Sequence, residues 1–188
     1  STGAGATGLP TGVTGAYSSG VFTISGTPTQ FGTFNYTVTT SGGTCTPATA
    51  TGTITVDEEP TVVLSSATGT NAQSVCVNTP ITDITYNIGG SATGAGVAGL
   101  PTGVTGSYSS GVFTISGTPT ATGTFNYTIT TTGGTCTAGT ATGTISVDVV
   151  PTIALTSAAG TAAQTLCAES AITNITYTVS GPATGATV

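Results

Sequence analysis

The sequence repeats itself almost unchanged every 91 residues, and this repeat restricts the fold more than any other feature. Placing residues 1–97 over residues 92–188 needs no gap and gives 67 identities in 97 pairs. The step Gly8-Leu9-Pro10-Thr11-Gly12 thus returns as Gly99-Leu100-Pro101-Thr102-Gly103. A period of 91 residues is longer than that of typical solenoid repeats and matches a small β-sandwich domain. We therefore expect similar domains joined end to end.

Within one period, short alternating segments predict strands rather than helices. Phe125, Tyr127 and Ile129 face one way, and the threonine and asparagine residues between them face the other. Further strands are expected near 62–64, 84–88, 97–104, 112–115 and 145–147, with a hairpin turn at Gly133-Gly134. About seven strands in roughly 90 residues predict an all-β chain of tandem immunoglobulin-like β-sandwich domains.

Two prolines suggest where one domain ends and the next begins. Pro60 and Pro151 each precede a new strand, and a proline suits a first strand residue or a junction because it cannot donate a ladder hydrogen bond. We expect residues 1–59 to be the C-terminal part of one domain, 60–150 to be a complete domain, and 151–188 to hold the N-terminal strands of the next. The connections are too short to be free linkers.

The composition excludes several classes of function. The chain has no Lys, Arg, His, Met or Trp, and its net charge is −6. Without cations it cannot neutralise phosphates, so we expect no nucleic-acid partner. Without histidine or lysine there is no histidine base, no Schiff base and no His-ligated zinc. We therefore expect no enzyme activity and no cofactor, and the lack of basic flanks also argues against direct membrane insertion.

Three segments of the repeat carry a family resemblance. They are Gly99–Val104, Gly111–Thr120 and Gly123–Thr128, and together they cover roughly half of a period. Their Leu-Pro-x-Gly step, Gly-Thr-Pro step and Gly-x-Phe strand resemble the immunoglobulin-like repeat of large bacterial surface proteins. The near-identity of the copies further resembles the giant adhesins and surface filaments of gliding bacteria, which a type IX system exports. The sorting domain usual in that family is absent from these residues, so this secretion route rests on analogy.

The resemblance implies an extracellular, cell-surface stalk or filament shaft that supports an adhesive tip. Its partners would be the neighbouring repeats of the same chain. Copies of the shaft could also associate with one another, side by side or end to end, into a filament. The alternative is an array of glycan-binding modules in which multiplicity supplies avidity. An ice-binding surface built from rows of threonine is the weakest hypothesis, because threonine is also simply a good strand residue.

Each period carries two cysteines, which are Cys45, Cys76, Cys136 and Cys167 in all. Repeated cysteines in a secreted chain favour oxidation. We favour a disulfide between Cys76 and Cys136 that closes one sandwich, with Cys45 and Cys167 pairing outside these residues. Pairing Cys45 with Cys76 and Cys136 with Cys167 would instead link consecutive domains, and four buried free thiols are the third interpretation.

Two further features are weak candidates for binding sites. Asp57-Glu58-Glu59 lies at a predicted junction and offers the oxygen ligands that calcium prefers, but the next junction keeps only Asp148. A solvated junction whose acids discourage edge pairing is the simpler interpretation. Tyr17 and Tyr108 are flanked by small residues and are candidates for stacking against sugars. Covering the end of the sandwich explains them equally well, and we favour that role.

Overall fold

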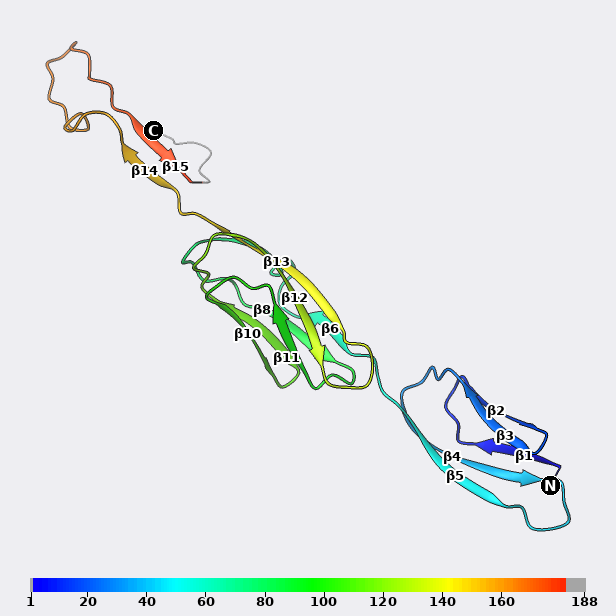
Figure 1. Ribbon diagram of the computed structural model, residues 1–188. Coiled ribbons are helices and arrows are strands. Elements are labelled where there is room, and N and C mark those ends of the chain that lie inside the picture. The colour runs from blue at the N-terminus through cyan, green and yellow to red at the C-terminus, as the bar shows by residue number, and fades with distance from the viewer. Residues whose placement is uncertain (1, 182–188) are drawn as a thin grey trace. The chain divides into compact units, whose positions relative to one another are not determined.

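We describe the protein from a computed structural model, which places residues 2–181. Every regular element among these residues is a strand, and no helix occurs in them (Figure 1). The strands are β1 Gly3–Thr7, β2 Val13–Ser18, β3 Val21–Gly26, β4 Gly32–Ser41, β5 Thr49–Val56, β6 Thr61–Leu64, β7 Ala72–Cys76, β8 Ile84–Gly89, β9 Gly94–Ala98, β10 Val104–Ser109, β11 Val112–Gly117, β12 Gly123–Thr132, β13 Thr140–Asp148, β14 Thr152–Leu155 and β15 Tyr177–Ser180. The expected all-β class is confirmed.

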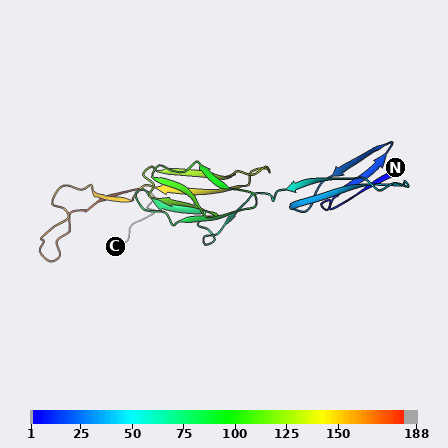
Figure 2. The ribbon, with the colours of Figure 1, turned by 90° about the horizontal axis from the view of Figure 1, so that it is seen from below.

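Strands β6 to β13 form a two-sheet sandwich. One sheet has the order β10-β11-β8-β6 and the other the order β7-β13-β12-β9. The β7–β13 pair is parallel, whereas the β10–β11, β11–β8 and β12–β13 pairs are antiparallel. Figure 2 shows these strands in layers along one common direction. The sandwich has eight strands, one more than the sequence suggested.

The core lies between the two sheets and is built by side chains that alternate along the strands. In β12, Tyr127 and Ile129 are buried while Thr124, Asn126 and Thr128 are exposed, which confirms the predicted alternation. Burial of such side chains is the main favourable term in folding. The buried apolar residues are Ile81, Ile84, Tyr86, Ile88, Val104, Phe113, Ile115, Tyr127, Ile129, Ile145 and Val147.

The strands before residue 60 repeat part of this arrangement. They form the three-stranded sheet β1-β4-β5 and the hairpin β2-β3. Their registers are those of the central strands shifted by one period: Tyr17 faces Phe22 as Tyr108 faces Phe113. After residue 151, β14 and β15 form an antiparallel pair. The final seven residues of the expected segment 151–188 lie outside the described residues.

The chain divides into two compact units by its internal contacts. One contains the chain up to Thr61 with the loops Gly89–Gly94 and Thr131–Gly139, and the other contains the remainder. This division passes through loops at one end of the β6–β13 sandwich. It does not test the domain boundaries expected at residues 60 and 151, which remain a prediction.

Candidate functional site

The Leu-Pro-x-Gly motif builds a turn just before β10. The Val104 N–H donates to the Pro101 carbonyl at 3.1 Å, which closes a four-residue turn. Gly103 has φ +89°, and a Cβ at this position would clash with the Thr118 carbonyl. Glycine tolerates both demands because it lacks a Cβ. Pro101 and Pro119 are fully buried, so the prolines of the two motifs shape the backbone and are not themselves exposed to a ligand.

The two candidate tyrosines lie on equivalent strands, β2 and β10. Tyr108 stands directly opposite Phe113, and residues opposite each other in an antiparallel pair share one face of the sheet. Phe113 is in the core, so Tyr108 also points to the core side and is half-buried. Tyr17 is half-buried opposite Phe22 in the same way. This placement favours the covering role over an open stacking platform.

The acidic segment before Pro60 contacts two loops of the chain that follows it. The Ser91 N–H donates to the Glu58 carbonyl at 3.1 Å. The Thr135 hydroxyl donates to the Asp57 carboxylate, and the Cys136 thiol donates to the Asp57 carbonyl at an Sγ–O distance of 3.7 Å. All five residues belong to one compact unit. The segment is therefore held by specific contacts, which its charge pattern alone did not predict.

These contacts bear on the calcium candidate at Asp57, Glu58 and Glu59. Among the residues that the structure describes, no three His, Cys, Asp or Glu side chains gather as metal ligands. Asp57 instead accepts a hydrogen bond from Thr135. The three adjacent acids thus do not form the cluster of oxygen ligands that calcium takes.

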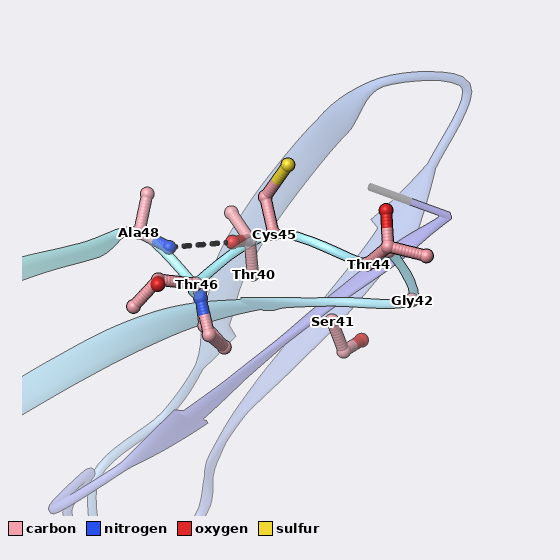
Figure 3. Close-up of a pocket in the computed structure, with 9 residues that line it drawn as sticks. Thr40, Ser41, Gly42, Thr44, Cys45, Thr46 and Ala48 are labelled. Atoms are coloured by element: carbon pink, nitrogen blue, oxygen red, sulfur yellow. Dashed lines mark hydrogen bonds between the residues drawn. The ribbon is translucent and has the colours of Figure 1, made fainter.

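The four cysteines occupy two kinds of place, and all four are free. Cys45 and Cys136 lie in the equivalent loops β4–β5 and β12–β13, while Cys76 ends β7. Cys45 is exposed, and Figure 3 shows its side chain projecting away from the loop. Cys136 and Cys76 are half-buried, and Cys167 is exposed.

The predicted disulfide between Cys76 and Cys136 is not found, and the geometry of β13 explains why. Cys76 is paired with Asp148, at the end of β13, whereas Cys136 precedes the first residue of this strand, Thr140, by four positions. Eight residue steps at about 3.3 Å each put the ends of β13 about 26 Å apart. The four residue steps from Cys136 to Thr140 reach at most about 14 Å, so Cys136 stays at least about 12 Å from the Asp148 end of β13, where Cys76 lies. A disulfide needs Cα atoms within about 7 Å. The favoured pairing is thus not formed in this structure.

A hollow of about 460 Å³ lies beside Cys45, bounded by residues 40–48. Its lining comes from the last two residues of β4 and from the β4–β5 loop (Figure 3). The Ala48 N–H donates to the Thr40 Oγ1 at 2.9 Å, and the equivalent bond joins Gly139 to Thr131 at 2.8 Å. This shared bond braces the loop, and the hollow is the space within it.

Two tyrosines meet in the core between the sheets, and the sequence did not predict this contact. The hydroxyls of Tyr86 on β8 and Tyr127 on β12 lie 3.0 Å apart in a hydrogen bond. Burial, and then the bond to Tyr86, raise the pKa of Tyr127 well above its ordinary value. The only sequence signal was that both residues fall on inward positions of their strands. The pair has no route to substrate because both rings are buried.

No helix in the described part of the chain is long and apolar enough to span a membrane.

Comparisons with known proteins identify the fold. No protein-family model matches the chain, and no curated protein matches it. Among solved structures, the chain is similar to the I-band fragment I67-I69 of titin, with a TM-score of 0.55, 14% identity and coverage of 74% of this chain and 50% of that one. An E-to-A variant of three titin immunoglobulin domains, I67-I69, gives a TM-score of 0.54 at 13% identity, with coverage of 75% and 51%.

Sidekick-1 immunoglobulin domains 1–5 match with a TM-score of 0.45 at 16% identity, covering 82% of this chain and 34% of that one. The chain spans about half the length of the titin fragments. Identities this low show the fold alone. The chain is an all-β protein of tandem immunoglobulin-like sandwich architecture.

Proposed function

We propose that the chain is a shaft segment of a large extracellular bacterial surface adhesin, in which each 91-residue repeat adds length and mechanical resistance. One observation carries the proposal: the polypeptide enters the β6–β13 sandwich at one end of β13 and leaves at the other. A domain of this kind extends a tandem chain, whereas a domain with both termini at one end would fold it back.

The two ends are defined by a contact before β13 begins and by the residue at which β13 ends. Where the chain enters, Gly139 lies against Pro60, so that a Cβ on Gly139 would be 2.6 Å from the Pro60 carbonyl oxygen. Where it leaves, β13 ends at Asp148, three residues before Pro151. The nine residues of β13 span roughly 30 Å at about 3.3 Å each. Each repeat therefore contributes a few tens of ångströms of reach.

The same strand also supports a mechanical role. β13 is hydrogen-bonded along one side to β12 over eight residue pairs and along the other to β7 over five. A pull between the two ends of the domain acts along this strand and must break both ladders together. Resistance to shear is thus built into the strand that joins one repeat to the next.

The remaining parts of the proposal follow from the repeat. Residues 60–150 are one repeat, 1–59 are the end of the preceding one, and 151–188 are the start of the following one. The shaft acts outside the cell as a non-enzymatic structural element, on the type IX route that the family resemblance suggests. The absence of Lys and Arg removes every tryptic cleavage site, which suits a protein exposed to proteases.

Stretching single molecules of the chain between its two ends tests the proposal. We expect one dominant rupture whose gain in contour length is about 290 Å, since 91 residues extend to about 320 Å and the folded domain already spans about 30 Å. Extension without a rupture, or a gain far from this length, would contradict the shaft.

A glycan array tests the alternative function on the same protein. We expect no binding above that of the unfolded chain. Saturable binding to one glycan class that disappears in the double variant Tyr17→Ala, Tyr108→Ala would favour the glycan-binding function over the shaft. Equivalent changes at Val21 and Val112, also in the β2–β3 and β10–β11 hairpins, are the matched control.

A further inference from the structure

Two cysteines of the repeat 60–150 lie against aspartates that occupy the same position in successive repeats. This position is the aspartate that ends the last strand of a domain, represented by Asp57 and Asp148, one period apart. Cys76 lies at Asp148 and Cys136 at Asp57. The two contacts come from opposite sides of the junction.

The contact from the preceding side is made by the end of β7. Cys76 is paired in parallel register with Asp148, and the next N–H, that of Val77, donates to the Asp148 carbonyl at 2.8 Å. The Ser74 hydroxyl donates to the Asp148 carboxylate at 3.1 Å. Ser74 and Cys76 are two residues apart, so both side chains project from the same face of β7 as the Asp148 carboxylate.

The contact from the following side is made by the β12–β13 loop. The Cys136 thiol donates to the carbonyl of Asp57 at 3.7 Å, and the Thr135 hydroxyl donates to the Asp57 carboxylate. Cys136 is half-buried here, while Cys45, its equivalent one period earlier, is exposed. The position of the loop cysteine is therefore set by the aspartate that precedes its repeat.

Both contacts use the same carbonyl oxygen of the repeat, and one carbonyl can accept two donors. The Val77 nitrogen lies 2.8 Å from the Asp148 oxygen, and the Cys136 sulfur lies 3.7 Å from the Asp57 oxygen. If both contacts are made to the oxygen of one aspartate, the sulfur and the nitrogen are at most about 6.5 Å apart, the sum of the two distances. That nitrogen is bonded to the carbonyl carbon of Cys76. The loop sulfur would therefore lie beside Cys76, and local adjustment of the two side chains and the loop would bring the Cβ atoms to the separation of about 4 Å that a disulfide needs.

We propose that Cys76 forms a disulfide with the cysteine at the Cys136 position of the next repeat, so that each junction carries one covalent bridge. The inference rests on the proposed shaft because it needs a following repeat. Cys136 pairs in the same way with the β7 cysteine of the preceding repeat. All four cysteines of these residues thus find their partners in other repeats.

The bond forms by thiol–disulfide exchange with a small-molecule or protein disulfide. Two S–H bonds break and one S–S bond forms, and the two thiols lose two protons and two electrons. The disulfide oxidant takes them up and is reduced to two thiols. An extracellular compartment allows this bond to persist.

A longer chain tests the proposal directly. Residue 188 aligns with residue 97, so appending a copy of residues 98–148 after residue 188 completes a further repeat and supplies a second copy of Cys136. After folding in a glutathione redox buffer, we expect one disulfide, between Cys76 and the added cysteine, and three thiols that react with an alkylating agent. The 188-residue chain should show four reactive thiols and no disulfide. Peptic peptides analysed by mass spectrometry without reduction give the connectivity.

Two variants of the longer chain provide matched controls. Cys76→Ser should abolish the disulfide, whereas Cys167→Ser, at the equivalent β7 position one period later, should leave it intact. A Cys76–Cys136, Cys45–Cys76 or Cys136–Cys167 bond, or a folded chain that keeps five thiols, would overturn the inference.

Stretching the longer chain under reducing conditions separates the two proposals. If stretching gives two ruptures that differ by one repeat in contour length, but oxidation produces no disulfide, then the shaft proposal holds and only the disulfide proposal is rejected. Loss of the ruptures themselves would remove the shaft.

Discussion

The strands before residue 60 and their copies in the central sandwich have nearly the same sequence but very different burial. The pairs β2–β3 and β10–β11 have the same register, as do β4–β5 and β12–β13. Yet Phe113, Ile115 and Ile145 are at most 2% exposed, while their equivalents one period earlier, Phe22, Ile24 and Ile54, are half-buried. The central copies have β6, β7 and β8 beside them, and these strands supply the missing partners.

The comparison separates two levels of structure. Strand pairing and turns follow from the local sequence, because both copies form them in the same register. Burial depends on strands from another part of the repeat. The copy of β7 at 163–167 shows the same dependence from the other side: β7 pairs with β13, and residues 163–167 form no strand.

The largest difference is expected for the phenylalanines of the two hairpins. Phe113→Ala should lower the free energy of unfolding of the main transition by about 3–5 kcal/mol, because it removes a buried ring and leaves a cavity. The matched change Phe22→Ala removes a half-exposed ring and should alter this transition by less than about 1 kcal/mol. Urea unfolding of both variants measures the difference. Equal losses would show that the two copies have equivalent cores.

A second difference is expected where a tyrosine lies over a glycine of the neighbouring strand. Tyr127 faces Gly143, and Tyr36 faces Gly52. A Cβ at either glycine would clash with the tyrosine ring. The buried Tyr127 has no room to move, so Gly143→Ala should cost about 1–3 kcal/mol of unfolding free energy. Tyr36 can turn toward solvent, so Gly52→Ala should lower the free energy of unfolding clearly less. Thermal unfolding of the two variants measures the difference. The reverse order would contradict the view that burial fixes the ring.

The third difference concerns the pH dependence of stability. The pKa of Tyr127 is raised above 10 in the folded state, chiefly by burial. The unfolded chain therefore loses this proton first, and stability should fall above pH 10 by up to about 1.4 kcal/mol per pH unit. Tyr127→Phe should remove this slope, whereas Tyr36→Phe should keep it. Urea unfolding at pH 9, 10 and 11 checks the result, and a slope that survives Tyr127→Phe assigns it to another group.

The sequence predicted what depends on neighbouring residues and missed what depends on distant ones. The alternation of Phe125, Tyr127 and Ile129 was visible locally. A hairpin connection at Gly133-Gly134 was also expected, but it is a loop over residues 133–139 and not a turn of two residues. β7 was not predicted because Ala72–Cys76 mixes small, polar and apolar residues without a clear pattern. The parallel register of β7 with β13 joins residues about 70 positions apart, and this register decides which cysteines can meet. The same limit hid the bond between Tyr86 and Tyr127.

The smallest difference is expected at the loop threonines, Thr135 and Thr44. Thr135 donates a hydrogen bond to the Asp57 carboxylate, whereas for Thr44 the structure shows no such bond. Thr135→Val should therefore lower the free energy of unfolding by about 0.5 kcal/mol, the lower end for a protein hydrogen bond, since this one is exposed to solvent. Thr44→Val should have no measurable effect.

Hydrogen exchange of the Ser91 amide, which is bonded to Glu58, reports the same contact locally and should accelerate in Thr135→Val alone. Equal exchange rates in the two variants would mean that the aspartate is held without the loop, and the junction would then owe its geometry to the backbone contacts of Glu58 and Pro60.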